Sequence, residues 1–414
     1  MDFKENLLTY LDKNFVDELL LSLNKERTNC LILNTNKMSD EKFIKLFPKV
    51  KKHEIIKHAY FYDKEDYDFG KSLYFDNGLF YIMDSASMMV PYLIPLNDGD
   101  YVLDMCAAPG GKSIFLSLKN NSINLISNDI NYQRSCILSS NIEKMGFSNV
   151  IVSSTTISLL ERYYKNTFDK IVLDAPCSGS AMFRKSEEMK EDWTYEKVLK
   201  CQKIQKELIE QASVMLKPGG ILSYSTCSFS YEENEDVVID FLNKHKDFKP
   251  LYIKENEYFV RGKNLPQSIH LFPNKYEGEG QFICLLKKDG VDRKNKIDNT
   301  KEFKHKEKID NNIYLYNNDL NLKPLKILRK GLLKAIIKGN IEIPSFHYAH
   351  YLSTTNSIAL NDEEVKKYIH GDEITKKLDL KNDYYVVSYN GINLGYVHKV
   401  NDKLKNLYPK GLRH

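Results

Sequence analysis

The sequence contains little that points to a membrane, to the cell exterior or to a bound metal. No apolar run is long enough to span a bilayer, and the first residues, "MDFKENLLTYLDKNF", lack the charged-then-apolar pattern of a signal peptide. The seven cysteines are far apart and form no CxxC pair or Cys/His cluster, which argues against a disulfide framework and a zinc site. We therefore expect a reduced, cytoplasmic protein, monomeric by default, that contacts no membrane and holds no metal.

The order of apolar segments predicts an α/β protein of two or three domains. A chain of 414 residues is too long for one ordinary core. Strand-like segments rich in Val, Ile and Leu alternate with helical ones, which predicts a doubly wound parallel sheet. The longest predicted helix runs from about 193 to 216 and ends at the turn signal "KPGG". The strands are expected at 101–107, 123–129, 149–154, 168–176, 219–228 and 281–288.

The flanking regions have different patterns. Residues 1–68 hold amphipathic helical segments, residues 289–310 are polar without periodicity and suit a linker, and residues 311–414 contain short strand-like pieces. The net charge of +4 says little, but 322–340 carries six Lys/Arg and no acid, and 398–414 carries five against one Asp. Either segment alone is best explained as a solvated face, whereas the two together favour nucleic acid.

A glycine loop follows the first strand of the predicted sheet. In "DMCAAPGGKS" (104–113), small residues let backbone amides approach a ligand, and the helix that follows favours an anionic group. It is not a P-loop, because Cys106 occupies the position of the required first glycine. Asp129 ends the second strand about 20 residues later, where an acid binds ribose hydroxyls. Alone it suits a helix cap equally well, but after such a loop a nucleoside ligand is the better interpretation.

Two cysteines end later strands in similar surroundings. Cys177 lies in "DAPCSGS" (174–180) and Cys227 in "YSTCSFS" (224–230). Ligand and chemistry sites of open parallel sheets collect at the carboxyl ends of strands, where backbone amides or a cation can lower a thiol pKa. The remaining candidates for buried, structural cysteines are Cys30, Cys136, Cys201 and Cys284.

These motifs, in this order, resemble the NOL1/NOP2/Sun (RsmB/NOP) family of RNA cytosine-C5 methyltransferases, and most of all its bacterial RsmF type, which acts on 16S ribosomal RNA. The resemblance continues through "KPGGILSYSTCSFSYEENEDVV" and "IHLFPNKYEGEGQFICLLKK" to the C-terminal "GINLGYVHKVNDKLKNLYPKGLR". It implies a class I, Rossmann-like S-adenosylmethionine-dependent core with two RNA-binding additions. The implied domains are an N-terminal RNA-binding segment (1–70), the methyltransferase domain (71–290), a linker (291–310) and a PUA-like β domain (311–414).

The resemblance also implies a role for each motif. Cys227 would be the nucleophile, Cys177 would help to release the product, and Asp174 would contact the target base and the cofactor. The partner would be RNA, as 16S rRNA or the small ribosomal subunit, and Lys185 suits an RNA phosphate as well as it suits an ordinary surface position. The residues implied to bind S-adenosylmethionine are Cys106, Ala107, Ala108, Pro109, Gly110, Gly111, Lys112, Asp129 and Asp174.

The chemistry explains why such residues are needed. Carbon 5 of cytosine is a poor nucleophile, and a thiolate that adds to carbon 6 makes it enamine-like. A carboxylic acid beside the ring nitrogen stabilises the adduct, and a second group then helps to expel the thiol. A paired cytosine is inaccessible, so the target must be unpaired or flipped out.

The chain departs from the family pattern at three places, and other functions stay open. Ile32 or Leu33 replaces an Arg, His270 and Asn274 replace the Arg and His of "RxxPH", and Thr155 and Thr156 lie where an acid is usual. A tRNA or DNA cytosine methyltransferase would keep the fold, and the DNA enzymes would make Cys177 the attacker. A ribosome-assembly factor that binds rRNA without needing catalysis is a third alternative.

Overall fold

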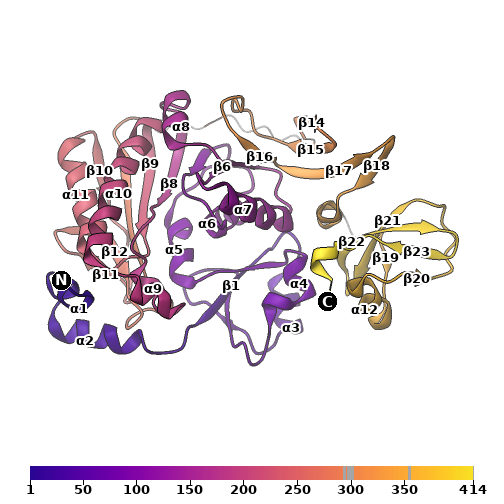
Figure 1. Ribbon diagram of the computed structural model, residues 1–414, viewed down its shortest axis with the longest axis horizontal. Coiled ribbons are helices and arrows are strands. Elements are labelled where there is room, and N and C mark those ends of the chain that lie inside the picture. Colours follow the sequence, from indigo (N-terminus) through magenta and orange to yellow (C-terminus); the bar gives the residue numbers. More distant parts are fainter. Residues whose placement is uncertain (292–294, 296–302, 353–355, 414) are drawn as a thin grey trace.

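A central sheet dominates the structure, which is a computed structural model that describes residues 1–291, 295, 303–352 and 356–413 (Figure 1). Its parallel part has the strand order β7-β6-β5-β8-β9, and β13 follows antiparallel beside β9. The doubly wound α/β fold predicted from the sequence is confirmed. These strands are β5 (Tyr101–Asp104), β6 (Asn124–Asn128), β7 (Val150–Ser153), β8 (Phe168–Asp174), β9 (Leu216–Thr226) and β13 (Gln281–Lys288).

Helices cover both faces of this sheet because neighbouring strand residues point to opposite sides. Val102 packs on the side of α5, α6 and α7, whereas Leu103 packs on the side of α8, α10 and α11. The same alternation holds for Leu125 and Ile126. The helices are α5 (Ser85–Leu93), α6 (Gly111–Lys119), α7 (Tyr132–Met145), α8 (Ile157–Tyr163), α10 (Tyr195–Met215) and α11 (Glu235–Lys244).

The "KPGG" segment is part of a strand and not a turn after a helix. Helix α10 ends at Met215, and β9 begins at once with Leu216, so that the two glycines lie inside the strand. Gly219 has a φ of +82°, and the pairing of β8 with β9 shifts register there. A bulge of this kind needs glycine. Because glycine is also typical of turns, the sequence predicted a turn here.

Further strands extend the sheet beyond β13. Strands β10, β11 and β12 lie at that end, with β12 paired to β13. The bounds of these strands are β10 (Phe248–Leu251), β11 (Val260–Gly262) and β12 (Leu265–Leu271).

None of the helices in the described ranges is long and apolar enough to cross a bilayer.

The N-terminal part is a pair of helices followed by a small sheet. Helices α1 (Phe3–Leu8) and α2 (Lys13–Ser22) contact the domain of the central sheet near α9 (Glu187–Glu191), and Phe3 packs against Phe183 and Trp193. The sheet has the order β2-β3-β1-β4, so it includes a strand beyond residue 70. Its elements are β1 (Asn29–Leu33), α3 (Asp40–Leu46), β2 (Lys51–Lys52), β3 (Ala59–Tyr62), α4 (Leu73–Asp76) and β4 (Phe80–Ile82).

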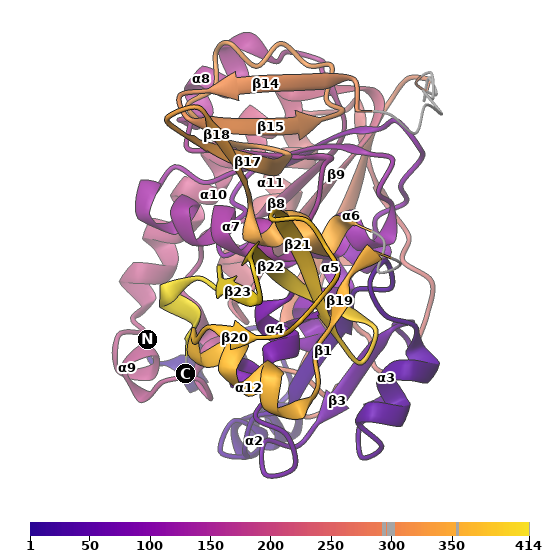
Figure 2. The same ribbon diagram turned by 90° about the vertical axis from the view of Figure 1, so that its right-hand side faces the viewer.

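The C-terminal region contains two further sheets (Figure 2). The second one contacts the N-terminal part, where Tyr408 donates a hydrogen bond to Asp76 and Lys42 donates one to the carbonyl of Asn390. The first sheet contains β14 (His305–Ile309), β15 (Asn312–Tyr316), β17 (Leu332–Lys338) and β18 (Ile341–Pro344). The second contains β19 (Ile358–Ala359), β20 (Ile374–Thr375), β21 (Tyr384–Tyr389), β22 (Ile392–Val400) and β23 (Lys403–Asn406), with α12 (Asp362–His370) beside it.

Two strands lie where the sequence predicted a linker and a basic surface. Strand β14 falls within the predicted linker 291–310. Its sequence, "HKEKI", is mostly charged and has no apolar run, so the sequence did not predict a strand there. Positions 292–294 and 296–302 of that predicted linker lie outside the described residues. Strand β16 (Ile327–Lys330) pairs with β7 and so joins the central sheet. Arg329 is buried in an ion pair with Glu143, so part of the basic segment 322–340 has a structural role.

Candidate active site

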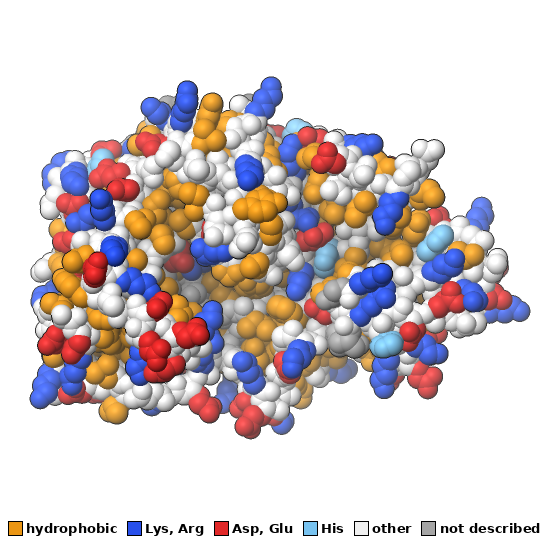
Figure 3. All heavy atoms as spheres, in the orientation of Figure 1, with side chains coloured by type: hydrophobic (Ala, Val, Ile, Leu, Met, Phe, Trp, Pro, Cys, Tyr) orange, Lys and Arg blue, Asp and Glu red, His pale blue; other side chains and the backbone are white. Residues whose placement is uncertain are grey.

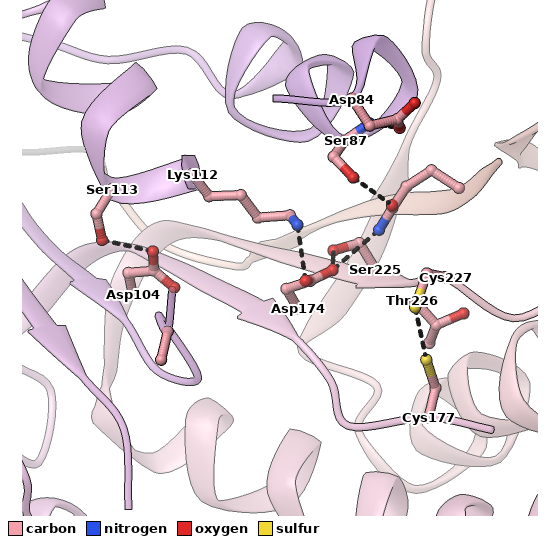
Figure 4. Close-up of polar contacts among 12 residues, drawn as sticks. Asp84, Ser87, Asp104, Lys112, Ser113, Asp174, Cys177, Ser225, Thr226 and Cys227 are labelled. Carbon is pink, nitrogen blue, oxygen red and sulfur yellow. Dashed lines mark hydrogen bonds and ion pairs between the residues drawn. The ribbon is translucent and has the colours of Figure 1, made fainter. Parts of the chain in front are cut away.

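The carboxyl ends of β5, β6, β8 and β9 bring the predicted site residues together (Figure 4). Asp104 ends β5, Asp129 follows β6, and Asp174 ends β8. Cys177 and Cys227 follow β8 and β9. Residues from four separate stretches of the sequence therefore share one edge of the sheet, as the parallel topology requires.

The glycine loop wraps tightly around the start of α6. Gly110 adopts a φ of +114°, and a Cβ atom there would lie 2.9 Å from Cδ1 of Leu138. A Cβ atom on Gly111 would lie 3.0 Å from Sδ of Met83. Position 110 therefore needs glycine, whereas a side chain at Gly111 would require Met83 to shift.

Asp129 holds the loop from the next strand. Its carboxylate accepts a hydrogen bond from the amide of Ala108 at 3.3 Å and one from the amide of Asn131 at 3.0 Å. Arg134 lies 3.5 Å from the same carboxylate and donates to the carbonyl oxygen of Ala108 at 2.6 Å. Asp129 is 3% exposed. The N-cap of α7 is Asn131 and not Asp129, so the predicted helix-cap role is wrong, while the predicted contact with ribose hydroxyls stays a prediction.

Asp104 is a buried carboxyl group with one free oxygen. Its Oδ2 accepts a hydrogen bond from Ser113 at 2.6 Å, while Oδ1 has no partner among the described residues. Burial raises the pKa of Asp104 to about 7, against the opposing hydrogen bond from Ser113 and the charge of Lys112. A ligand with a cation or an N–H group near Oδ1 would supply the missing partner.

Asp174 is bound from three sides (Figure 4). Lys112 lies 2.7 Å from its Oδ2, while Ser225 and Gln281 donate to its Oδ1 at 2.7 Å and 2.9 Å. Burial alone would lower the pKa of Lys112, but the charges of Asp174, Asp104 and Cys227 outweigh it, and the pKa is raised. The carboxylate is thus fixed beside a permanent cation at the mouth of the site.

The two cysteine sulfurs are in contact. Sγ of Cys177 lies 3.2 Å from Sγ of Cys227, and both side chains are partly accessible. The hydrogen bond to Cys227 and burial are the main causes that raise the pKa of the Cys177 thiol well above its ordinary value, with smaller effects from the charges of Cys227, Glu233 and Asp174. The raised pKa favours the protonated thiol at Cys177, whose S–H can be donated to the neighbouring sulfur.

The other cysteines are less uniform than predicted. Cys30 and Cys284 are buried as expected. Cys136 is exposed on α7 and Cys201 is half-buried on α10, so the prediction of a buried structural role is wrong for Cys136. The helical pattern around Cys136 places it on the outward face, which a general preference of cysteine for interiors does not reveal.

The departures from the family pattern have structural explanations in two cases. Thr155 accepts a hydrogen bond from the amide of Lys326 at 2.9 Å, so its hydroxyl helps to join β16 to the sheet. His270 is buried and lies 2.9 Å from Glu235, stacked on Phe272. Nothing in the structure explains Asn274, whose side-chain atoms have no partner among the described residues.

Sequence reasoning assigned no role to two residues of this site. Gln281 contacts Asp174, and Glu233 bonds to the residue that follows each cysteine. Both lie in segments that were recognised as family signatures. Gln281 begins the antiparallel strand β13 and Glu233 lies in a short turn, so neither stands at the carboxyl end of a parallel strand, and no physical signal in the sequence distinguishes them from ordinary polar residues.

Two family models match the chain. The model described as 16S rRNA methyltransferase RsmB/F matches residues 91–287, and the model described as methyltransferase RsmF PUA domain matches residues 355–414. The first range contains the whole edge on which the site residues meet. The second contains the five-stranded C-terminal sheet.

The chain is similar to curated proteins over most of its length. It is 30% identical over 428 residues to ribosomal RNA small subunit methyltransferase F of Shewanella piezotolerans, which covers 92% of this chain and 90% of the relative. It is 29% identical over 378 residues to the protein of the same name from Vibrio vulnificus, covering 81% and 79%.

Solved structures share the fold. A methyltransferase homolog protein from Pyrococcus horikoshii is 30% identical with a TM-score of 0.60, over 69% of this chain and 93% of that one. NSun6 from Pyrococcus horikoshii, solved with SFG, has a TM-score of 0.62 at 21% identity, over 70% and 98% of the two chains. At that identity the second likeness concerns the fold alone.

Proposed function

Since this chain belongs to the 16S rRNA methyltransferase RsmB/F family and is an S-adenosylmethionine-dependent RNA methyltransferase, we propose that it methylates carbon 5 of a cytosine in 16S rRNA through a covalent bond from Cys227 to carbon 6. The family membership confirms the resemblance seen in the motifs. The observation that carries the mechanism is the 3.2 Å contact between Cys177 and Cys227, with Asp174 on the adjacent strand.

The residues of the glycine loop fit the cofactor. Residues 107–111 carry no side chain larger than a proline ring, and Asp104 has a buried acceptor oxygen without a partner among the described residues. Asp104, Asp129 and the loop from Cys106 to Lys112 would hold S-adenosylmethionine, which supplies the methyl group when bound. Opposite charge suits a cationic donor here, since three carboxylates face one edge of the sheet.

The two thiols divide the covalent chemistry. The thiolate of Cys227 adds to carbon 6, and Asp174 stabilises the adduct by sharing a proton with the ring nitrogen. After methyl transfer, the proton on carbon 5 must leave and the bond from sulfur to carbon 6 must break. Cys177 lies against the sulfur that is expelled, which supports its role in release.

A cavity near the cysteine loops supports the RNA part of the proposal. The turn Ser180–Met182 bonds to the Cys227 segment through the amide of Ala181, and the chain continues directly into Phe183 and Lys185. These two residues line a cavity of about 580 Å³ together with Lys25. A lining that combines aromatic and lysine side chains suits a base and its phosphate. The face drawn in Figure 3 is hollowed near its centre, with Lys and Arg side chains on the border.

The test compares the two thiols. Wild type, Cys177→Ala and Cys227→Ala would be incubated with 16S rRNA or small subunits and labelled S-adenosylmethionine, with Cys136→Ala as the control for an exposed thiol. We expect Cys227→Ala to lose transfer and Cys177→Ala to accumulate a denaturant-resistant complex of protein and RNA. The reverse pattern would assign the attack to Cys177, as in a DNA-type enzyme. Transfer to tRNA and not to 16S rRNA would refute the substrate.

A further inference from the structure

One buried carboxylate lies behind both cysteine loops. Glu233, at the end of the turn Tyr231–Glu233, is 0% exposed. It accepts hydrogen bonds from the backbone amide of Ser178 at 2.8 Å and from the hydroxyls of Ser178 and Ser228. Ser178 follows Cys177 and Ser228 follows Cys227, so a single side chain is bonded to both loops next to the reacting sulfurs.

Each cysteine is held on its other side as well. Gln205 of α10 donates to the carbonyl of Pro176 at 2.9 Å and to Glu233 at 3.0 Å, so the residues before and after Cys177 are fixed by one pair of side chains. Asn234 accepts from the hydroxyl of Thr226 and donates to the carbonyl of Ser228 at 2.8 Å. The contact between the two sulfurs is thus set by neighbouring residues of one turn.

The charge of Glu233 acts on the thiol of Cys177. Behind the hydrogen bond to Cys227 and burial, Glu233 is among the groups that raise the pKa of Cys177. Lys112, which is paired with Asp174, lies on the other side of the site. The charge of Cys227 is one of the effects that raise the pKa of Lys112. After the larger effect of desolvation, Glu233 also raises the pKa values of Tyr224 of β9 and Cys201 of α10.

We propose that Glu233 is a positioning residue that sets the distance between the two sulfurs and whose negative charge adds to the hydrogen bond and the burial that keep Cys177 a thiol, so that Cys227 is the sulfur that ionises. Burial raises the pKa of Glu233, while four hydrogen bonds, from the amide and hydroxyl of Ser178, the hydroxyl of Ser228 and the amide of Gln205, oppose this shift and favour the ionised carboxylate. Electrostatic repulsion makes a second anion at Cys177 costly, while the S–H of Cys177 is free to stabilise a thiolate on Cys227. This inference rests on the roles proposed above for the cysteines.

The test measures which thiol ionises, without RNA. Glu233→Gln keeps the size of the side chain and removes the charge. Alkylation by iodoacetamide would be followed for each cysteine by mass spectrometry between pH 6 and 10. We expect Cys227 to react first in the wild type. In Glu233→Gln the alkylation of Cys177 should begin at lower pH and become about tenfold faster at pH 8, which corresponds to about one pKa unit. Glu232→Gln removes the neighbouring charge and should change neither profile.

Two further variants keep the inference testable if Glu233→Gln does not fold. Ser178→Ala and Ser228→Ala each retain the carboxylate of Glu233 and remove one hydrogen bond from a hydroxyl group to it. The order of thiol reactivity should therefore persist while methyl transfer falls. An unchanged Cys177 profile in Glu233→Gln, or a reversed order in either serine variant, would overturn the proposal. Because alkylation needs no substrate, its failure is distinct from a failure of methyl transfer to RNA.

Discussion

The ammonium group of Lys112 lies 2.7 Å from Oδ2 of Asp174. This ion pair joins the first turn of α6, which follows the proposed cofactor loop, to the end of β8, which precedes the Pro-Cys motif. Lys112 is only 12% exposed, so the interaction is poorly screened by water. The cofactor loop and the proposed base-contacting carboxylate are therefore mechanically and electrostatically linked.

Replacing Lys112 by Met should uncouple the glycine loop from the carboxylate of Asp174. Asp174 would lose its cation, and we expect methyl transfer to fall by about 10²-fold, the magnitude typical of a lost charge-stabilising group. Single-turnover transfer and calorimetric titration with S-adenosylmethionine would separate chemistry from binding. Lys112→Arg should recover part of the rate, and the exposed Lys165→Met serves as control. Wild-type rates in Lys112→Met would contradict this role.

Gly110→Ala should damage both stability and cofactor binding. An alanine at φ +114° is strained, and its Cβ would meet Leu138 at 2.9 Å. We expect a loss of about 2–4 kcal/mol in the free energy of unfolding, measured by urea titration. Gly339→Ala is the matched control, since Gly339 also has a positive φ but no atom within 4 Å, and should cost about 1 kcal/mol. Equal losses in the two variants would refute the steric argument.

Acid should lower the free energy of unfolding through two buried histidines of the C-terminal region. Burial, and then the nearby positive charge of Lys37, lower the pKa values of His347 and His350 well below their ordinary value, so both are neutral in the folded state. In the unfolded chain the two histidines titrate near pH 6.5. The free energy of unfolding therefore keeps their full contribution above that pH and decreases as the pH falls below it, by up to about 1.4 kcal/mol per pH unit and histidine.

Urea unfolding at pH 7.5 and 5.5 would measure this loss. His350→Gln removes one titrating group and should reduce the difference between the two pH values. His370→Gln changes an exposed histidine and should leave the difference as it is in the wild type. The histidine contribution is disproved if His350→Gln behaves like His370→Gln.

The single tryptophan reports on the N-terminal helices. Trp193 is 8% exposed, and its ring centroid lies 5.3 Å from that of Phe3 in α1. Phe3→Ala should let water reach the indole and shift its emission to longer wavelength. Leu8→Ala changes an exposed residue of the same helix and should not. An unshifted spectrum in Phe3→Ala would show that α1 does not cover Trp193 in solution.

The sequence predicts the central sheet well because its strands are buried on both faces. Segments such as Tyr101–Asp104 are short apolar runs with a motif directly behind them, and strand ends meet at one edge in any parallel sheet. The C-terminal strands were harder to predict. "HKEKI" and "ILRK" alternate or mix charge with apolar residues, and whether such a strand pairs with its neighbour or with a distant β7 depends on tertiary contacts.

The same limit applies to the site. Cys177 and Cys227 stand out because each follows an apolar strand and precedes hydroxyl residues. Their contact distance does not follow from the sequence, because it depends on Glu233, which bonds to positions 55 and 5 residues away along the chain. A side chain whose role is to join two loops has no periodicity or motif of its own.

Strand β16 has a consequence for how the molecule can be divided. It supplies the outer hydrogen-bonding edge of the catalytic sheet, beside Val150–Ser153, although it comes after the segment that ends at Lys288. A protein cut near residue 290 would bare a strand whose four residues are all buried here, and such an edge invites pairing between molecules. The C-terminal half is therefore not a detachable accessory, and a shorter ancestor or descendant would need another way to protect that edge from aggregation.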